Sequence, residues 1–408
     1  MTDHAGASGS SSLVLVINAG SSSLKYSVVD GATGTTQASG LVEGVGGRSG
    51  RLTHEAQGRS HTADLGEVGH AEALDAALEA LQQHGPGLRE ADLRAVGHRL
   101  VHGGTRFSDP TLVTDDVLAS VQELTPLAPL HNPANLAALE VARRAFPHLP
   151  HVAVFDTAFH QTMDPVAHTY ALPESWREEL GVRRYGFHGT SCAYVSREAA
   201  RLLGASPEDV NLVVLHLGNG ASATAVRAGR SVDTSMGMTP LEGLVMGTRS
   251  GDVDPAVFGY LDRERGLTSA EVERALNHDS GLKGLAGDND LRSVEQQAAA
   301  GDADARLALD VYCHRIRKYV GAYYAVLGTV DAVVFTAGVG ENSATVRAAS
   351  LSGLERLGIE LDEDRNGDVP RGTAATISTD ASDVTVLVVP TDEEAEIARQ
   401  ALVVVAGD

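Results

Sequence analysis

The stretch Leu13-Val-Leu-Val-Ile-Asn-Ala-Gly-Ser-Ser-Ser-Leu-Lys-Tyr-Ser-Val-Val29 decides the fold: an apolar strand, a tight turn of small residues and a second strand. Small residues let backbone N–H groups approach an anion closely, while the serine hydroxyls and Lys25 add hydrogen bonds and positive charge. A P-loop uses similar residues but leads into a helix, whereas the β-branched residues after Lys25 continue as a strand. The stretch therefore predicts a β-hairpin suited to phosphate and excludes a P-loop.

A related pattern returns in the second half of the chain as Leu212-Val-Val-Leu-His-Leu-Gly-Asn-Gly-Ala-Ser-Ala-Thr-Ala-Val226. Taken alone, either segment could be an ordinary polar hairpin without a ligand. The second copy favours a chain built from two related halves that both handle a nucleotide.

Composition limits the class of protein. A chain of 408 residues exceeds what one hydrophobic core usually serves, which predicts two domains. The formal charge of −22 argues against nucleic acid as a partner, and no apolar run approaches the ~20 residues of a membrane helix. Residues 1–12 are expected to form a disordered extension without the apolar core of a signal peptide, which favours the cytoplasm. Cys192 and Cys313 are interpreted as two buried thiols.

The apolar periodicity predicts alternating strands and helices. Thr391 and Glu394 have the spacing of a capping box at the start of a C-terminal helix. The long glycine-rich segment 231–255 is expected to be a functional loop. The expected helices cover 68–83, 134–145, 304–327 and the C-terminal end, and the expected strands after the first hairpin are 95–100, 151–157, 212–217, 221–227, 330–336 and 384–389.

Three short motifs match the patterns of other functional sites only in part. Gly338-Val-Gly-Glu-Asn342 lacks the third glycine of a dinucleotide fingerprint, so a contact to adenine or ribose-phosphate fits it better. Ser22-Ser-Leu-Lys25 matches S-x-x-K acylases, but their partner motifs are missing and the segment is a strand. His98 and His102 have the spacing of a zinc pair on a helix, yet their surroundings are extended, which favours packing or hydrogen bonding.

Individual cationic residues are informative in so acidic a chain, since an anionic ligand must meet a local positive pocket. Arg99 and Arg249 each lie in a glycine-flanked loop, and the planar fork of arginine matches a carboxylate or phosphoryl group. Asp156 and His188 are polar residues whose ordinary roles would be capping or core hydrogen bonding. Only the convergence of these four residues would make a site.

Taken together, the motifs resemble the acetate kinases, within the superfamily of acetate and sugar kinases, heat-shock chaperones and actin. They follow one another in family order along nearly the whole chain. The matching segments are Val16–Lys25, Gly97–Gly104, Pro129–Pro133, Phe155–Thr162, Tyr185–Thr190, His216–Gly220, Gly247–Asp252 and Gly338–Asn342.

The resemblance implies an α/β fold of two duplicated actin-like (ribonuclease H-like) domains, with mixed β-sheets flanked by helices and the active site in the interdomain cleft. The N-terminal domain would cover 13–157, completed by a helix at 393–408, and the C-terminal nucleotide-binding domain 158–392. The implied reaction is reversible transfer of the ATP γ-phosphoryl group to acetate, giving acetyl phosphate and ADP. Mg²⁺, or alternatively Mn²⁺, would be the metal, and the chain would form a homodimer.

The resemblance also assigns roles to residues. Arg99 and Arg249 would bind the acetate carboxylate and the migrating phosphoryl group, His188 would stabilise the transition state, and Asp156 would orient the nucleophile and the neighbouring arginine. These roles make chemical sense, because a carboxylate is already ionised at neutral pH and attacks phosphorus without a strong base. Positive charge and alignment then carry the catalysis.

The remaining assignments concern metal, nucleotide and substrate. Asn18 and Glu393 would help hold Mg²⁺. The implied ATP-binding residues are Lys25, His216, Leu217, Gly218, Asn219, Gly220, Asp290, Leu291, Arg292, Gly338, Val339, Gly340, Glu341 and Asn342. The implied acetate-binding residues are Arg99, Val101, Leu130, Phe187 and Pro240.

Two alternatives stay open. A propionate or butyrate kinase on the same scaffold is hard to separate, because one extra methylene changes selectivity by only ~1–3 kcal/mol. A non-catalytic, nucleotide-switched protein of the chaperone or actin type is the more remote alternative. The sequence departs from the family at Cys192, Lys283 and Asp392, and none of these departures removes an implied catalytic residue.

Overall fold

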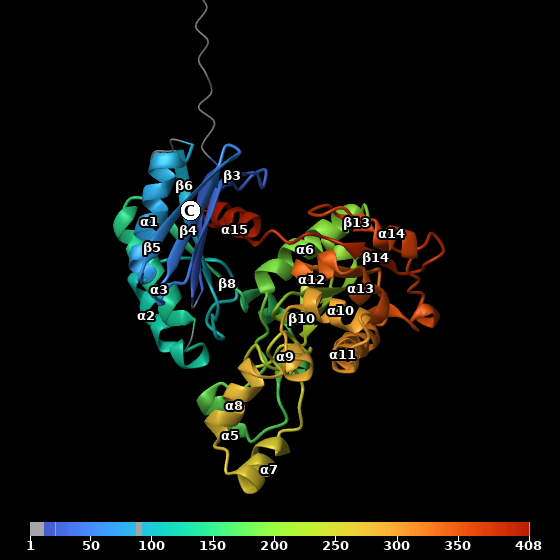
Figure 1. Ribbon diagram of the computed structural model, residues 1–408. Coiled ribbons are helices and arrows are strands. Elements are labelled where there is room, and N and C mark those ends of the chain that lie inside the picture. Colours follow the sequence, from blue (N-terminus) through green and yellow to red (C-terminus); the bar gives the residue numbers. More distant parts are fainter. Residues whose placement is uncertain (1–11, 21, 87–91, 130, 408) are drawn as a thin grey trace, which may run out of the picture. The chain divides into compact units, whose positions relative to one another are not determined.

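The computed structural model describes residues 12–20, 22–86, 92–129 and 131–407. They form two compact units (Figure 1). The N-terminal unit runs as far as Ala158 and takes up the chain again from Asp392, and the C-terminal unit is Phe159–Thr391. The extension expected at residues 1–12 lies, except for Ser12, outside the described residues.

The N-terminal unit is built on an eight-stranded mixed sheet in the order β5-β4-β3-β2-β1-β6-β8-β7. The first hairpin pairs antiparallel, while β1, β6 and β8 run parallel. The strands are β1 Leu13–Ala19, β2 Ser23–Asp30, β3 Thr36–Glu43, β4 Gly50–Ala56, β5 Arg59–Gly66, β6 Leu93–Leu100, β7 Thr111–Leu112 and β8 His151–Phe155, and the helices are α1 His70–His84, α2 Asp115–Glu123, α3 Asn132–Ala145 and α15 Glu393–Gly407.

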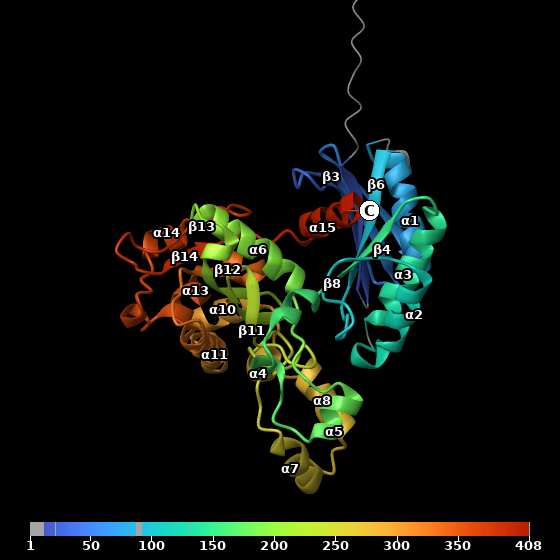
Figure 2. The same ribbon diagram turned by 180° about the vertical axis from the view of Figure 1, so that it is seen from behind.

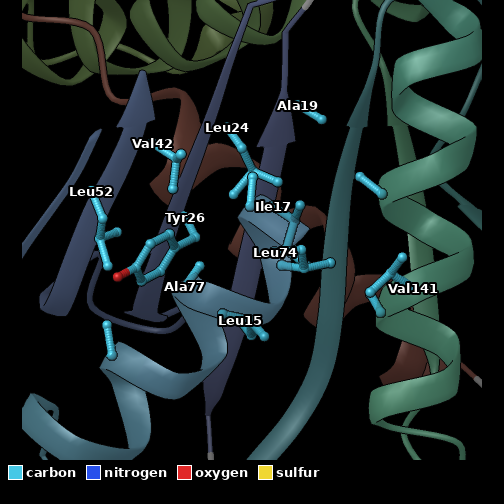
Figure 3. Packing of buried hydrophobic residues seen from close by; sticks show 14 of the residues in the cluster. Leu15, Ile17, Ala19, Leu24, Tyr26, Val42, Leu52, Leu74, Ala77 and Val141 are labelled. Atoms are coloured by element: carbon cyan, nitrogen blue, oxygen red, sulfur yellow. The ribbon is translucent and has the colours of Figure 1, made fainter. Parts of the chain in front are cut away.

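Alternation along β1 divides its side chains between two layers. Leu15 and Ile17 pack with residues of α1 and α3, among them Leu74 and Val141, as Figure 3 shows. Helix α15 covers the other face, where a Cβ on Gly97 would lie 2.7 Å from the side chain of Ile397. The C-terminal helix therefore seals the sheet that the first residues of the chain begin.

The C-terminal unit holds a six-stranded mixed sheet in the order β11-β10-β9-β12-β14-β13. Helix α6 packs on one face of it (Figure 2), and one side of the long helix α11 packs against β9 and β10. The strands are β9 Asn211–Leu217, β10 Ala221–Arg227, β11 Arg230–Thr234, β12 Ala332–Thr336, β13 Ala375–Thr376 and β14 Thr385–Val388, and the helices are α4 Pro165–His168, α5 Glu174–Leu180, α6 Gly189–Leu202, α7 Ala256–Arg265, α8 Ser269–His278, α9 Gly281–Ala286, α10 Leu291–Ala299, α11 Ala303–Leu327, α12 Ala337–Asn342, α13 Ala344–Leu351 and α14 Glu363–Gly367.

The two sheets share one core topology. In each, the first strand of an antiparallel hairpin begins a parallel run: β1 pairs with β6 and β6 with β8, just as β9 pairs with β12 and β12 with β14. This confirms the duplicated α/β architecture that the two related hairpins predict.

Two local predictions are wrong. The loop expected from residue 231 begins only after β11, because Arg230–Thr234 pairs with β10 and extends the sheet. The cap of α15 is Asp392, whose Oδ1 accepts a hydrogen bond from the backbone N of Ala395 at 2.9 Å. Thr391 instead hydrogen-bonds the hydroxyl of Ser191 at 2.7 Å.

The prediction for the two cysteines is confirmed. Cys192 and Cys313 are free, buried thiols. Within the described ranges no helix has both the length and the apolar character needed to cross a membrane. Among those same residues no group of three or more His, Cys, Asp or Glu side chains is placed to bind a metal ion.

A buried histidine pair links β6 to β8. Nε2 of His98 lies 2.9 Å from Nδ1 of His151, and Nε2 of His151 lies 3.1 Å from the carbonyl oxygen of Phe146. Hydrogen bonding is thus the role of His98, as the extended pattern favours. Burial lowers the pKa of both imidazoles, so the folded protein holds this pair neutral.

We predict that this pair makes the N-terminal unit acid-sensitive. Below about pH 6.5 the unfolded chain binds protons that the folded pair does not, so the free energy of unfolding falls by up to about 1.4 kcal/mol per pH unit for each histidine. His98→Gln should flatten this dependence, measured by urea unfolding at pH 7.5 and pH 5.5. His148→Gln, at an exposed position, should keep the wild-type slope, and equal slopes in all three proteins would refute the prediction.

Candidate active site

Strand register brings one set of the predicted residues together in the N-terminal unit. Asn18 is paired directly with Arg99 across β1 and β6. Asp156 follows β8, and its backbone N donates to the carbonyl of Leu100 at 2.9 Å. Glu393 opens α15. The ends of three parallel strands and one helix therefore meet at the same edge of the sheet.

Arg99 is the hub of this cluster. Its Nε donates to Asp156 Oδ1 at 3.2 Å, its second terminal nitrogen pairs with Asp156 Oδ2, and its first donates to Asn18 Oδ1 at 3.2 Å. The Nε atom also lies 3.7 Å from Glu393 Oε2. The Arg99 side chain is 19% exposed and the Asp156 side chain 2%, so a buried acid holds the partly exposed arginine in a fixed direction.

Charge and burial oppose each other here. Burial alone would lower the pKa of Arg99, but the negative charges of Asp156 and Glu393 outweigh it and raise that pKa. For Glu393, burial is the largest effect, and together with the carboxylates of Asp156 and Glu394 it raises the pKa to about 7 against the opposing charge of Arg99. Arg99 is thus permanently charged, whereas Glu393 gains a proton readily.

The sequence analysis missed two side chains that hold the first hairpin in place, a buried amide and a partly buried imidazole. Asn135 on α3 donates to the carbonyl of Ala19 at 2.5 Å and accepts from the backbone N of Val101 at 3.1 Å. His70 on α1 lies 2.8 Å from the carbonyl of Gly20. These contacts fix both the turn and the residues after β6. An asparagine in a helical pattern gives little warning of such a role, because the contact joins distant segments.

Three further residues of the N-terminal unit are predicted to bind acetate or ATP. Val101 is buried after β6. Leu130 lies outside the described residues. Lys25 lies on β2, where its Nζ is 2.7 Å from Oε1 of Glu394, and half of its side chain is exposed. The lysine is therefore tied to the C-terminal helix, in the same unit as Arg99.

A second cluster lies in the C-terminal unit. His188 precedes α6 with a left-handed backbone, φ = 59°, and its Nδ1 lies 3.0 Å from the hydroxyl of Ser222. Its ring stacks on His216 with centroids 4.1 Å apart. Nδ1 of His216 in turn lies 2.8 Å from the hydroxyl of Ser191. Strained backbone and stacking together fix the direction of the His188 ring.

Arg249 reaches the same place from the loop after β11. Its guanidinium donates to the carbonyl of Pro240 at 3.1 Å and to the sulfur of Met246 at 3.8 Å. No acidic side chain pairs with it among the residues that the structure describes, and burial lowers its pKa. A Cβ on Gly220 would lie 3.5 Å from both the guanidinium of Arg249 and Nε2 of His188. The arginine, the histidine and the second hairpin turn therefore converge.

A pocket of about 640 Å³ opens beside that turn, within the usual size range of small-molecule sites. Eight of the predicted nucleotide residues line it: Gly218, Asn219, Asp290, Leu291, Arg292, Gly338, Val339 and Asn342. The lining residues that the predicted set does not contain are Gly247, Leu282, Asn289, Glu295, Tyr312, Ser343 and Arg371. The pocket carries both signs of charge, as a ligand with a base, a sugar and phosphates would need.

The remaining predicted residues of this unit do not line the pocket. His216 and Leu217 are buried in β9, and Phe187 is buried with its carbonyl 2.9 Å from Nε2 of His160. The carbonyls of Gly340 and Glu341 each accept a hydrogen bond from a buried arginine, Arg347, at 3.0 Å. Arg347 thus holds Gly340 and Glu341 in place between the lining residues Val339 and Asn342.

Comparison with known proteins gives a consistent result. Residues 13–399 match the sequence model of the acetokinase family. An acetate kinase from Streptomyces avermitilis is 56% identical over 392 residues, covering 95% of this chain and 96% of the relative. The crystal structure of Porphyromonas gingivalis acetate kinase has a TM-score of 0.91 at 44% identity, and a propionate kinase from Francisella tularensis has 0.90 at 39%. Each comparison covers 96% of this chain and 99% of the solved one.

The duplicated mixed sheets flanked by helices are the actin-like α/β fold that these solved structures share. The chain belongs to the acetokinase family. The active-site cleft expected between the domains stays a prediction.

We predict that Gly247→Ala weakens nucleotide binding. A Cβ at this position would lie 2.0 Å from Oδ1 of Asn219 and 3.1 Å from the carbonyl of Asn289, so the pocket wall must shift. Overpacking of this kind costs about 1–3 kcal/mol, which corresponds to roughly a 5- to 150-fold weaker affinity for ADP in calorimetric titration. Gly321→Ala, where a Cβ meets nothing within 4 Å, is the control, and unchanged affinity in the Gly247 variant would contradict the prediction.

Proposed function

We propose that the chain is an acetate kinase, an enzyme that transfers the γ-phosphoryl group of ATP directly and reversibly to the carboxylate of acetate. The products are acetyl phosphate and ADP. Support comes from whole-length identity to acetate kinases together with two fixed arginines and a pocket beside a glycine turn.

The difference between the two arginines is the observation that carries the proposal. The carboxylates of Asp156 and Glu393 balance the positive charge of Arg99, so the main contribution of Arg99 is a guanidinium held in a fixed direction. Arg249 is partly buried and has no acidic partner within the described part of the chain, so it gains most from an incoming anion. The migrating phosphoryl group is such an anion, and acetate is a second one.

The chemistry needs charge more than proton transfer. Acetate is ionised at neutral pH and attacks phosphorus through a carboxylate oxygen, while the bond to the ADP oxygen breaks. Negative charge on the three equatorial oxygens would be stabilised by Arg249 and by His188, whose directions the loop and the stacked ring fix. Asp156 would hold Arg99 at the carboxylate.

Magnesium is the metal that the family implies, and the residues fit it. Asn18 and Glu393 offer an amide and a carboxylate oxygen, the donors that Mg²⁺ prefers, and two protein ligands suffice where phosphates supply others. The Asn18 oxygen accepts a hydrogen bond from Arg99 and the Glu393 oxygen lies 3.7 Å from the Nε of Arg99, so both oxygens are next to the same guanidinium. When bound, the metal would neutralise charge on the ATP phosphates.

The proposal names acetate as the acceptor, whereas the same fold also occurs in a solved propionate kinase. The resemblance assigns Val101 and Phe187 to the methyl group of acetate, and each of them is a buried apolar residue of its own unit. A solved propionate kinase has almost the same TM-score as a solved acetate kinase, so the backbone does not separate the two substrates. Propionate is therefore the alternative acceptor. A nucleotide-switched chaperone or actin-like protein would leave the two arginines without a role. The cytoplasmic location stays a prediction.

We predict that both arginines are needed for turnover. Arg99→Ala and Arg249→Ala should each reduce acyl phosphate formation about 10²-fold or more, if they act like other fixed donors to a transition state. Hydroxylamine trapping of the product from ATP plus acetate, propionate or butyrate measures this and ranks the acceptors.

The controls for this assay are surface arginines of the same two units. Arg106→Ala and Arg306→Ala remove exposed ion pairs to Glu123 and Asp310 and should leave turnover unchanged. A wild-type protein that forms no acyl phosphate, or arginine variants at full speed, would overturn the proposal.

We further propose a homodimer. The segment from α4 to the end of α5 exposes large apolar side chains, with Val166 at 89%, Trp176 at 48% and Leu180 at 65%. Such exposure favours a protein interface. Light scattering should give twice the chain mass of 42.5 kDa. Trp176→Asp should shift the protein toward monomer, whereas Val403→Asp, at an exposed position in the other unit, should not, and a monomeric wild type would contradict the proposal.

A further inference from the structure

The loop that carries Arg249 is closed at its base by a reciprocal pair of hydrogen bonds. The backbone N of Gly243 donates to Oδ1 of Asp252 at 2.8 Å, and the backbone N of Asp252 donates to the carbonyl of Gly243 at 3.0 Å. We call the segment between them, Gly243–Asp252, the arginine loop. The Asp252 side chain therefore helps to join the two ends of the segment, so that the backbone from Gly243 to Asp252 forms a closed loop.

The arginine loop has little room to relax inside that ring. The backbone N of Met246 donates to the carbonyl of Arg249 at 3.1 Å. A Cβ on Gly251 would lie 2.4 Å from the carbonyls of Gly243 and Leu244, and one on Gly281 would lie 2.1 Å from the carbonyl of Met246. Backbone packs directly on backbone here, so a shift at the base of the loop is transmitted to Arg249.

Helix α11 braces the closing residue from outside the loop. Oδ2 of Asp252 accepts a hydrogen bond from the hydroxyl of Tyr319 at 2.9 Å and lies 3.3 Å from a terminal nitrogen of Arg315. Arg315 also donates to the carbonyl of Gly243 at 2.9 Å and to that of Asp252 at 3.3 Å. Both ends of the arginine loop are thus tied to one long helix.

The brace is well placed to act through Arg249. Neighbouring turns of α11 bury Ile316 and Val320, so the helix is a fixed support. Among the residues that the structure describes, the Asp252 carboxylate contacts the loop and α11, and Asp252 does not line the nucleotide pocket. Asp252 would therefore affect phosphoryl transfer by setting the direction of the Arg249 guanidinium.

We propose that Asp252, held by Arg315 and Tyr319, is the positioning residue that aims the Arg249 guanidinium at the phosphoryl group. This inference rests on the proposed acetate kinase function. A merely structural role would lower stability without any link to Arg249, so the test has to measure coupling between the two residues.

A double-mutant cycle measures that coupling. Asp252→Asn should lower kcat for acyl phosphate formation about 10-fold, since a small misplacement of a catalytic group is costly, and change the affinity for ADP less than about 2-fold. In the Arg249→Ala background the same substitution should cost less than about 2-fold, because the group that it positions is gone. Tyr319→Phe removes one hydroxyl and serves as the milder variant, with a smaller loss that also vanishes without Arg249.

Asp331→Asn is the matched control. Its carboxylate also accepts a backbone hydrogen bond, from the N of Asn211 at 2.6 Å, but at the end of β9 away from the Gly218–Gly220 turn. It should leave kcat unchanged. If Asp252→Asn and Tyr319→Phe both keep the wild-type kcat, or if their losses persist in the Arg249→Ala background, the proposal is wrong.

A second readout separates the proposal from the function that it rests on. Amide hydrogen exchange of peptides covering the arginine loop should be faster in Asp252→Asn than in the wild type, with α6 and β9 unchanged. If the wild-type protein forms no acyl phosphate, the proposed function fails, and the exchange data alone then decide whether Asp252 orders the loop. Unchanged exchange in the loop would refute the brace.

Discussion

Parallel pairing of a hairpin strand with its neighbours is the constraint on which both halves of the molecule depend. Because β1, β6 and β8 run in one direction, the residues that follow them meet at one edge, and Asn18, Arg99 and Asp156 become neighbours although they are distant in sequence. In the C-terminal unit the residues that follow the parallel strands β9 and β12 meet in the same way and line one pocket, and His188 and Arg249 lie beside the turn after β9. Strand direction therefore places the segments around which each cluster forms.

The two clusters solve the problem of holding positive charge in a chain of net charge −22 in different ways. Arg99 is neutralised and aimed by a buried acid, which costs affinity for a second anion but fixes geometry. Arg249 is aimed by one backbone carbonyl, a sulfur and a closed loop, and keeps its full charge for a ligand. An enzyme that brings two anions together has a use for both arrangements.

Much of this was predictable from local pattern. The two hairpins, the long helices and the residues at strand ends follow from apolar alternation and from glycine turns, and most of the expected nucleotide residues line one pocket. Contacts that join distant segments were not predictable. Asn135 looks like any polar residue of an alanine-rich helix, and Tyr319 shows no sign of reaching Asp252. The cap of α15 was misassigned by one residue, since Thr391 and Asp392 are both good caps and only tertiary contacts choose between them.

The closing of the first sheet by α15 has a consequence for synthesis of the chain. Ile397 fills the space above Gly97, and Glu393 completes the cluster around Arg99, yet both follow the whole C-terminal unit in the sequence. The sheet of the N-terminal unit therefore keeps one apolar face uncovered while the C-terminal unit is translated.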